Sequence, residues 1–410
     1  MEQQLIPHLF RTEYRKLASV LCKHFGIEHI EVAEDIAAET FLAALESWPY
    51  KGIPPNPVAW LHAVAKNKAR NYQHKSQTYL LKVAPNIKRD LDGIVPELDL
   101  SEQNITDSQL QMLFALCHPS ISMESQIGLS LRILCGFGIE EIANGFLTSK
   151  DVINKRLFRA KEKLREVGVA VEMPDEAAIT QRLEPVLTTL YLVFNEGYYS
   201  ESSNTIIRED FCLAAMQLVK LLLDNDRTNL PEVNALYALM CFHASRFKAR
   251  KGQNGEMILY ADQDESLWDI ELISQGAYYL NKASSGSKLS KYHLEASIAY
   301  WHTKKEDTQD KWESILQLYN KLLMIAYSPI AALNRTYALS KVRGVALAIV
   351  EAEKLQLTDN HFYHLLLAEL YWLTNRNQAL AHLKTALPLV KTRLERQLVM
   401  KKIQLLSLTN

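Results

Sequence analysis

The sequence has few cysteines, no long apolar run and no glycine-rich phosphate loop. Its five cysteines stand far apart without a CxxC pair, which argues against a zinc site or a disulfide framework. No stretch reaches the roughly 18 apolar residues of a membrane span, and the first residues carry charges too early for a signal peptide. The 14 glycines include no GxGxxG or GxxxxGK pattern. We therefore expect a cytoplasmic globular protein with no membrane contact, no cofactor and no metal.

Strand patterns are also nearly absent. Apolar residues recur every three or four positions along the chain, which predicts an all-α fold. Proline-rich or weakly patterned stretches interrupt this period and mark the expected boundaries. They predict a helical domain over 1–77, a linker over 78–105, a second helical domain over 106–170 and a long helical C-terminal region over 178–410.

The net charge of −1 conceals strong local asymmetry. From Gly26 to Trp48 there are six acids and no Lys or Arg, whereas from Trp60 to Arg89 there are seven bases and no acid. From Thr148 to Arg165 there are seven bases and two acids, which gives a local charge of +5. Blocks of one sign on short helices are typical of surfaces that bind charged partners, although a single block is more often a solvated face.

The stretch from Gly138 to Glu166 has the pattern of a helix-turn-helix. A short helix with apolar Ile139, Ile142 and Phe146 is followed by "LTSKD", in which Thr148 or Ser149 is the expected N-cap. In the second helix one apolar stripe leaves Lys155 and Arg159 on the opposite side, as docking in a DNA major groove requires. The candidate DNA-contacting residues are Lys150, Asn154, Lys155, Arg156, Phe158, Arg159 and Lys163.

A second basic amphipathic helix runs from Trp60 to Lys75, after the proline-rich loop expected over 48–57. Its polar face combines asparagines, which can hydrogen-bond an unstacked base, with cations that can hold a phosphate backbone. The candidate residues on this helix are Trp60, Lys66, Asn67, Arg70, Asn71, His74 and Lys75.

The helix that precedes it, "IEVAEDIAAETFLAALESW", is acidic. Glu34, Asp35, Glu39 and Thr40 are expected to form an anionic, hydrogen-bonding face that suits a basic helical partner rather than DNA. Its apolar contacts are expected from Ile36, Phe41, Leu42 and Leu45.

The C-terminal region contains a faint repeat. "YALSKVRGVALAIVEA" from Tyr337 and "YWLTNRNQALAHLKTA" from Tyr371 align with an offset of 34 residues between the tyrosines. Helix pairs at this period are typical of tetratricopeptide repeats, which stack to form a concave interaction surface. Generic helix pairing is the alternative.

The order of these parts resembles the extracytoplasmic-function (ECF) sigma factors of bacterial RNA polymerase. "AEDIAAETFLAAL" is similar to their region 2.2, "NPVAWLHAVAKNKARNYQHK" to regions 2.3 and 2.4, and the stretch from 138 to 166 to region 4.2. The resemblance implies docking on the β′ clamp helices and the β subunit of core polymerase, recognition of the −10 promoter element by the helix from Trp60, and reading of −35 by the helix after Ser149. Two departures are Ala38, where Gln is common, and Asn154, where a basic residue often reads −35.

The remaining chain resembles one ECF subgroup that has a tetratricopeptide-like C-terminal extension. The supporting segments are "CHPSIS" at 117–122, "LYLVFNEGYYS" at 190–200, "ADQDESLWD" at 261–269 and "SPIAALNR" at 328–335. The resemblance implies that the extension regulates sigma activity, through its own contacts or through a protein or ligand bound to it. Candidate regulatory contacts are Asp262, Asp264, Trp268 and Asp269.

No catalytic residues are assigned, because no nucleophile–base set is recognisable and one acidic segment does not make a metal site. We therefore expect a transcription factor rather than an enzyme. The alternative is a helix-turn-helix repressor or activator with a tetratricopeptide sensor, which binds DNA without core polymerase. An acidic docking helix beside a second DNA-facing helix favours the sigma factor.

Overall fold

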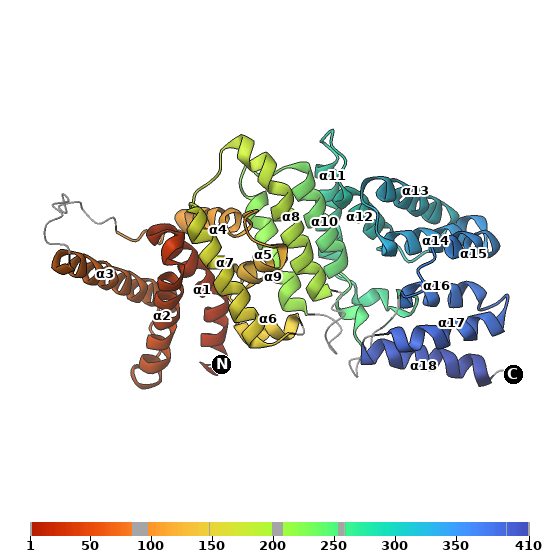
Figure 1. Ribbon diagram of the computed structural model, residues 1–410, viewed down its shortest axis with the longest axis horizontal. Helices are drawn as coiled ribbons and strands as arrows, with labels where there is room; N and C mark the ends of the chain where they lie inside the picture. Colours follow the sequence, from red (N-terminus) through yellow and green to blue (C-terminus); the bar gives the residue numbers. More distant parts are fainter. Residues whose placement is uncertain are drawn as a thin grey trace. The chain divides into compact units, whose positions relative to one another are not determined.

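The computed structural model describes residues 2–83, 97–146, 148–198, 208–252, 258, 260–390 and 392–408. These residues form eighteen α-helices and no β-strand, so the all-α prediction is confirmed (Figure 1). None of the described helices is long and apolar enough to cross a membrane. The chain divides into two compact units, Met1–Val193 and Phe194–Asn410, which are considered separately.

The first unit contains α1 to α7 and most of α8. Two short non-α turns, η1 and η2, interrupt the series, and η2 is a π-helical segment. The bounds are α1 Glu2–Phe25, η1 Ile27–His29, α2 Ile30–Lys51, α3 Pro57–Val83, α4 Glu102–Leu116, α5 Met123–Leu129, η2 Ser130–Leu134, α6 Ile139–Gly145, α7 Lys150–Val167 and α8 Glu176–Tyr198. The expected linker is thus helical as far as Val83, and its part from 84 to 96 lies outside the described residues.

Helices α1, α2 and α3 pack against one another at the N-terminal end. Small and apolar residues at helical spacing, such as Ala33, Ala37 and Phe41, form the buried side of α2. The loop expected over 48–57 is shorter than predicted, because α2 continues through Pro49 to Lys51 and ends at Gly52. Gly52 has a φ of 79°, which favours glycine.

The two helices expected after Gly138 are present as α6 and α7. Ser149 caps α7, since its hydroxyl oxygen accepts a hydrogen bond from the Val152 amide at 3.2 Å. The predicted stripe on α7 is buried, and Gly168 ends the helix in the left-handed conformation. The stripe consists of Ile153, Leu157, Ala160 and Leu164.

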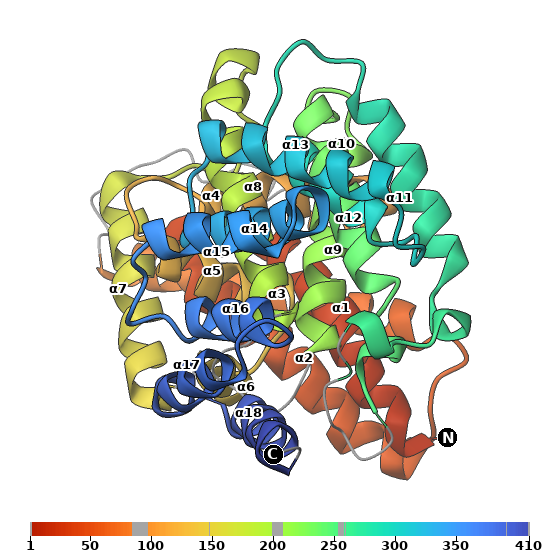
Figure 2. The same ribbon diagram turned by 90° about the vertical axis from the view of Figure 1, so that its right-hand side faces the viewer.

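The second unit continues with helix pairs that contact their neighbours in sequence order, as Figure 2 shows for α14 to α17. The segments of the faint repeat fall on α14–α15 and α16–α17, and Ala379 of the second pair is fully buried. The tetratricopeptide relationship stays a prediction. The bounds are α9 Glu209–Leu223, α10 Pro231–Ala244, η3 Lys248–Arg250, η4 Tyr260–Asp262, η5 Glu265–Leu267, α11 Ile270–Ala283, α12 Lys291–Trp301, α13 Gln309–Ile325, α14 Pro329–Arg343, α15 Val345–Lys354, α16 His361–Tyr371, α17 Arg376–Leu389 and α18 Arg393–Leu408.

All five cysteines are buried and free of disulfides. Burial raises the pKa of the Cys117 thiol to about 11 and that of Cys135 to about 12. The thiolate is the reactive form of cysteine, so these side chains are poor nucleophiles in the folded chain.

Adjacent residues of α7 provide a test of its orientation. Leu157 is 3% exposed and Phe158 is 63% exposed. We expect Leu157→Ala to lower the free energy of unfolding by about 2–5 kcal/mol, because it leaves a cavity in the core. Phe158→Ala is the control and should change it by less than about 0.5 kcal/mol. Urea denaturation followed by helical circular dichroism measures both, and equal losses would contradict the orientation.

Candidate functional site

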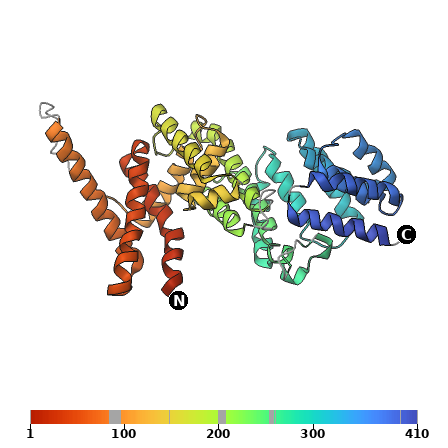
Figure 3. The same cartoon turned by 60° about the horizontal axis from the view of Figure 1, so that its bottom comes forward.

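The polar face predicted on α3 is exposed. Figure 3 shows α3 extending away from α1 and α2. Trp60 is half-buried at the start of the helix, where its ring centroid lies 5.4 Å from that of Trp48 on α2. Lys66 is also half-buried and lies 3.4 Å from the Glu97 carboxylate. The exposed candidates are Asn67, Arg70, Asn71, His74 and Lys75.

A buried polar contact fixes the inner side of α3 against α1. The imidazole of His62 lies 3.5 Å from the Glu13 carboxylate, which also pairs with Lys16 at 2.7 Å. Burial of Glu13 alone would raise its pKa, but the contacts with His62 and Lys16 outweigh burial and leave that pKa lowered. The contact is one of those that hold this side of α3 against α1, together with the buried Leu61 and Ala65.

The basic face predicted on α7 is also exposed. Phe158 stands uncovered among the cations of this face, while Arg156 is half-buried. Lys150 pairs with Glu140 of α6 at 2.8 Å, and Lys163 pairs with Glu166 of its own helix at 3.1 Å. Exposed pairs of this kind are weak, so both lysines can exchange them for a phosphate at little cost. The exposed candidates are Lys150, Asn154, Lys155, Phe158, Arg159 and Lys163.

The acidic set predicted on α2 does not form one outward face. Asp35 and Glu39 are exposed, and Glu39 pairs with Lys68 of α3 at 2.7 Å. Thr40 is buried and donates a hydrogen bond to the Ile36 carbonyl at 2.7 Å. Glu34 is only 7% exposed. The expectation that all four face outward is wrong, because Glu34 and Thr40 lie on the side of α2 that packs inward.

Two leucines of α2 lie on the opposite side from their expected position. The sequence predicts apolar packing for Leu42 and Leu45, but each is 52% exposed. At 100° per residue Leu42 lies opposite the buried Ala33, on the same side as Asp35 and Glu39. The accessible face of α2 is therefore a mixture of acids and exposed leucines.

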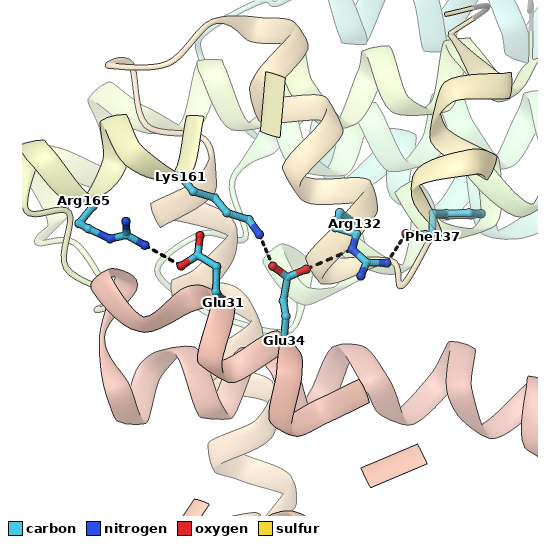
Figure 4. Close-up of polar contacts among 6 residues, drawn as sticks. All are labelled: Glu31, Glu34, Arg132, Phe137, Lys161 and Arg165. Atoms are coloured by element: carbon cyan, nitrogen blue, oxygen red, sulfur yellow. Dashed lines mark hydrogen bonds and ion pairs between the residues drawn. The ribbon is translucent and has the colours of Figure 1, made fainter. Parts of the chain in front are cut away.

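The buried Glu34 carboxylate binds two cations from the second half of the unit (Figure 4). One oxygen accepts from Arg132 Nε of η2 at 3.1 Å, and the other pairs with Lys161 Nζ of α7. Arg132 also donates from Nη1 to the Phe137 carbonyl at 3.2 Å. This three-residue cluster joins α2 to α7.

A more exposed pair lies beside this cluster. Arg165 of α7 pairs through Nη2 with Glu31 of α2 at 2.6 Å, and its Nε donates to the Glu28 carbonyl at 3.1 Å. Arg165 also pairs with Glu162 of its own helix. α2 and α7 are thus joined at two positions.

Sequence reasoning missed the role of Lys161, Arg165 and Arg132. The two α7 residues belong to a basic block, and they flank the apolar stripe rather than lying opposite it. Arg132 stands alone in the apolar run "LSLRILCG", and a lone charge in such a run indicates a buried partner. The sequence gives no means of identifying that partner as Glu34, 98 residues away.

The acidic segment of the second unit has local structural roles. Asp264 caps η5 by accepting from the Ser266 amide, and Asp269 caps α11 by accepting from the Leu272 amide. Trp268 is buried and stacks on Tyr260 with centroids 6.3 Å apart. Asp262 is exposed. Among the described residues no group of three or more His, Cys, Asp or Glu is placed to hold a metal ion.

Comparisons with known proteins match two segments of the chain to family models and most of its length to one relative. The model of sigma-70 region 2 matches residues 9–78, which include most of α1 and α3 and all of α2. A family of unknown function, DUF6596, matches residues 182–284. The uncharacterized protein R00370 of Rhizobium meliloti (strain 1021) is 34% identical over 341 residues, which cover 82% of this chain and 80% of that protein. No solved structure matches. The chain therefore belongs to the same family as R00370, and its N-terminal domain is a sigma-70 region 2, the part of a sigma factor that acts in promoter-directed transcription.

Proposed function

We propose that the chain is a sigma factor of the ECF type, which binds core RNA polymerase and directs it to specific promoters. The match of residues 9–78 to sigma-70 region 2 carries this proposal. The accessible face of α2, with Asp35, Glu39, Leu42 and Leu45, is the proposed docking surface for core polymerase. Its acids suit a basic partner helix, and its leucines can be buried on binding.

The exposed polar faces of α3 and α7 are the proposed DNA-binding surfaces. Asn67, Arg70 and Asn71 on α3 supply the donors and acceptors that an opened −10 element needs. Lys155 and Arg159 on α7 are the residues proposed to enter the major groove at −35, because both are exposed on the side of the helix away from the buried stripe. The helix-turn-helix role of α6 and α7 belongs to this proposal.

The C-terminal helical unit is proposed to modulate this activity. Stacked helix pairs suit recognition of a protein or ligand. Of the acidic segment, Asp262 is exposed and does not cap a helix, so it is the best placed of the four candidates to contact another surface.

The docking surface can be tested with Leu42→Asp. The substitution removes apolar area that should be buried against core polymerase, so we expect the dissociation constant for core polymerase to rise at least about tenfold. Run-off transcription should fall in parallel. Leu373→Asp is the matched control, since Leu373 is an exposed leucine outside α2. Equal affinity of the two variants for core polymerase would contradict this docking surface. Specific binding to promoter DNA that needs no core polymerase would contradict the sigma factor assignment.

The −35 surface can be tested with Arg159→Ala. Loss of one base contact is worth roughly 1–3 kcal/mol, so run-off transcription at limiting holoenzyme should fall about 5- to 150-fold. Lys384→Ala removes an exposed lysine of α17 and should have no effect. On a template whose −35 element is scrambled, parent and Arg159→Ala should transcribe equally; a persistent difference would place Arg159 elsewhere.

Regulation by the extension can be tested with Asp262→Lys. If this acid restrains the sigma part, charge reversal should raise run-off transcription severalfold. Asp359→Lys reverses another exposed acid of the same unit and serves as the control. Unchanged transcription with Asp262→Lys would rule out this residue as a regulatory contact.

A further inference from the structure

Two buried cations lie close together inside the second unit. Arg246 follows the end of α10, and Lys311 lies in the first turn of α13. Arg246 is 8% exposed and Lys311 is 2% exposed. The guanidinium carbon of Arg246 lies 5.6 Å from the centre of the Tyr260 ring, and the ammonium nitrogen of Lys311 lies 5.3 Å from the same centre. Two cations from distant parts of the sequence therefore share one aromatic ring.

In the part of the chain that the structure describes, neither cation forms an ion pair with a carboxylate. The ammonium group of Lys311 donates hydrogen bonds to the Tyr260 hydroxyl at 3.1 Å and to the Lys304 carbonyl, and both acceptors are neutral. The Nε of Arg246 is buried and has no hydrogen-bond partner among the described residues. Removal of a charge from water is costly unless an opposite charge compensates it. Both cations therefore lack the group that normally accompanies a buried charge.

The acids nearest to this pair of cations do not compensate it. Burial lowers the pKa of Lys311, and the charges of Asp307 and Glu265 offset this effect only in part. The carboxylate of Asp307 accepts a hydrogen bond from Trp312 Nε1 and pairs with Lys341 at 3.2 Å. Glu265 is exposed. The excess of positive charge around Lys311 thus remains.

The groups around the two cations add hydrogen-bond donors but no negative charge. Burial, reinforced by the charges of Arg246 and Lys311, lowers the pKa of His302 to about 3, so its ring is neutral at pH 7. Burial also holds the pKa of His243 well below its ordinary value, and the Nδ1 of this ring is buried without a partner among the described residues. The same holds for Nε1 of Trp268, which can only donate. These unpaired nitrogens require an acceptor.

We propose that Arg246, Lys311, Tyr260 and Trp268 form an oxyanion site that binds a phosphate group. A phosphate carries a charge of about −1.5 to −2 at pH 7 and at least three acceptor oxygens, so it matches two cations and several N–H donors better than a carboxylate does. Little of either cation is accessible, so the ligand is inorganic phosphate or a small phosphomonoester rather than a nucleic-acid backbone. The site lies within the second unit, and its existence does not depend on the proposed function.

Equilibrium dialysis of the full-length chain against labelled inorganic phosphate tests the oxyanion site. With the ionic strength held constant by chloride, we expect one phosphate to bind per chain. Lys311→Met and Arg246→Gln each remove one charge-assisted hydrogen bond with little change in size, so each should weaken phosphate binding about 10- to 150-fold. Lys321→Met on α13 and Arg343→Gln on α14 make the same changes at exposed positions and should bind phosphate like the parent.

Hydrogen exchange of the parent chain shows where the phosphate binds. Tyr260 and Trp268 bound the segment that lies over the two cations, so saturating phosphate should slow amide exchange between them. Slowed exchange confined to α3 or α7 would place the phosphate on the proposed DNA-binding surfaces and overturn the oxyanion site. This measurement needs no variant, so it remains decisive if Lys311→Met or Arg246→Gln fails to fold.

Competition in the same dialysis identifies the ligand. Acetate should displace labelled phosphate at least about tenfold less well than unlabelled phosphate does, and equal displacement would overturn the assignment to phosphate. Stronger displacement by glycerol phosphate than by inorganic phosphate would identify a phosphomonoester as the ligand, and the reverse order would identify inorganic phosphate; both results support the site. Unchanged phosphate affinity in both folded cluster variants, or no binding to the parent, overturns the inference. None of these measurements uses polymerase or DNA, so failure of the proposed function would leave their result unaffected.

Discussion

One buried carboxylate links the two halves of the N-terminal unit. A carboxylate removed from water is tolerated only when cations and hydrogen bonds compensate it. Glu34 meets this requirement with Arg132 and Lys161, which come from segments 98 and 127 residues further along the chain. In measured cases, loss of one partner from a buried pair costs roughly 3–5 kcal/mol. The exposed pair between Glu31 and Arg165 contributes little energy by comparison, but it restricts the orientation of α7.

The position of this carboxylate on α2 shows how the different sides of the helix are occupied. α2 packs against α1 through small and apolar residues, offers Asp35, Glu39 and two leucines to the outside, and holds α7 along its edge. The three sides follow from the 3.6-residue period, which distributes neighbouring sequence positions around the helix. The sigma-70 region 2 match therefore covers a helix whose surface is shared between a proposed partner and the chain itself.

Most of the fold was predictable from the sequence, because helical periodicity and capping residues are local signals. The pattern around Ser149 identified both the start of α7 and its buried stripe. The same reasoning failed for Leu42 and Leu45, since an exposed leucine and a leucine in the core look alike in sequence. It also failed for Glu34, because the partners of a buried charge are set by tertiary contacts. The blocks of like charge predicted the exposed polar faces of α3 and α7. They did not predict that Lys161 of α7 pairs with Glu34 while Arg159 stays exposed.

The division of α2 into an accessible and an occupied part has a kinetic consequence. Asp35 and Leu42 are exposed, whereas the two carboxylate oxygens of Glu34 are occupied by Arg132 and Lys161. A partner that approached α2 would therefore meet the outer residues first, and could reach Glu34 only by taking the place of Arg132 or Lys161. The rate of the first encounter would then depend on the charge and apolar area of the outer residues, while the buried carboxylate would affect only the later steps.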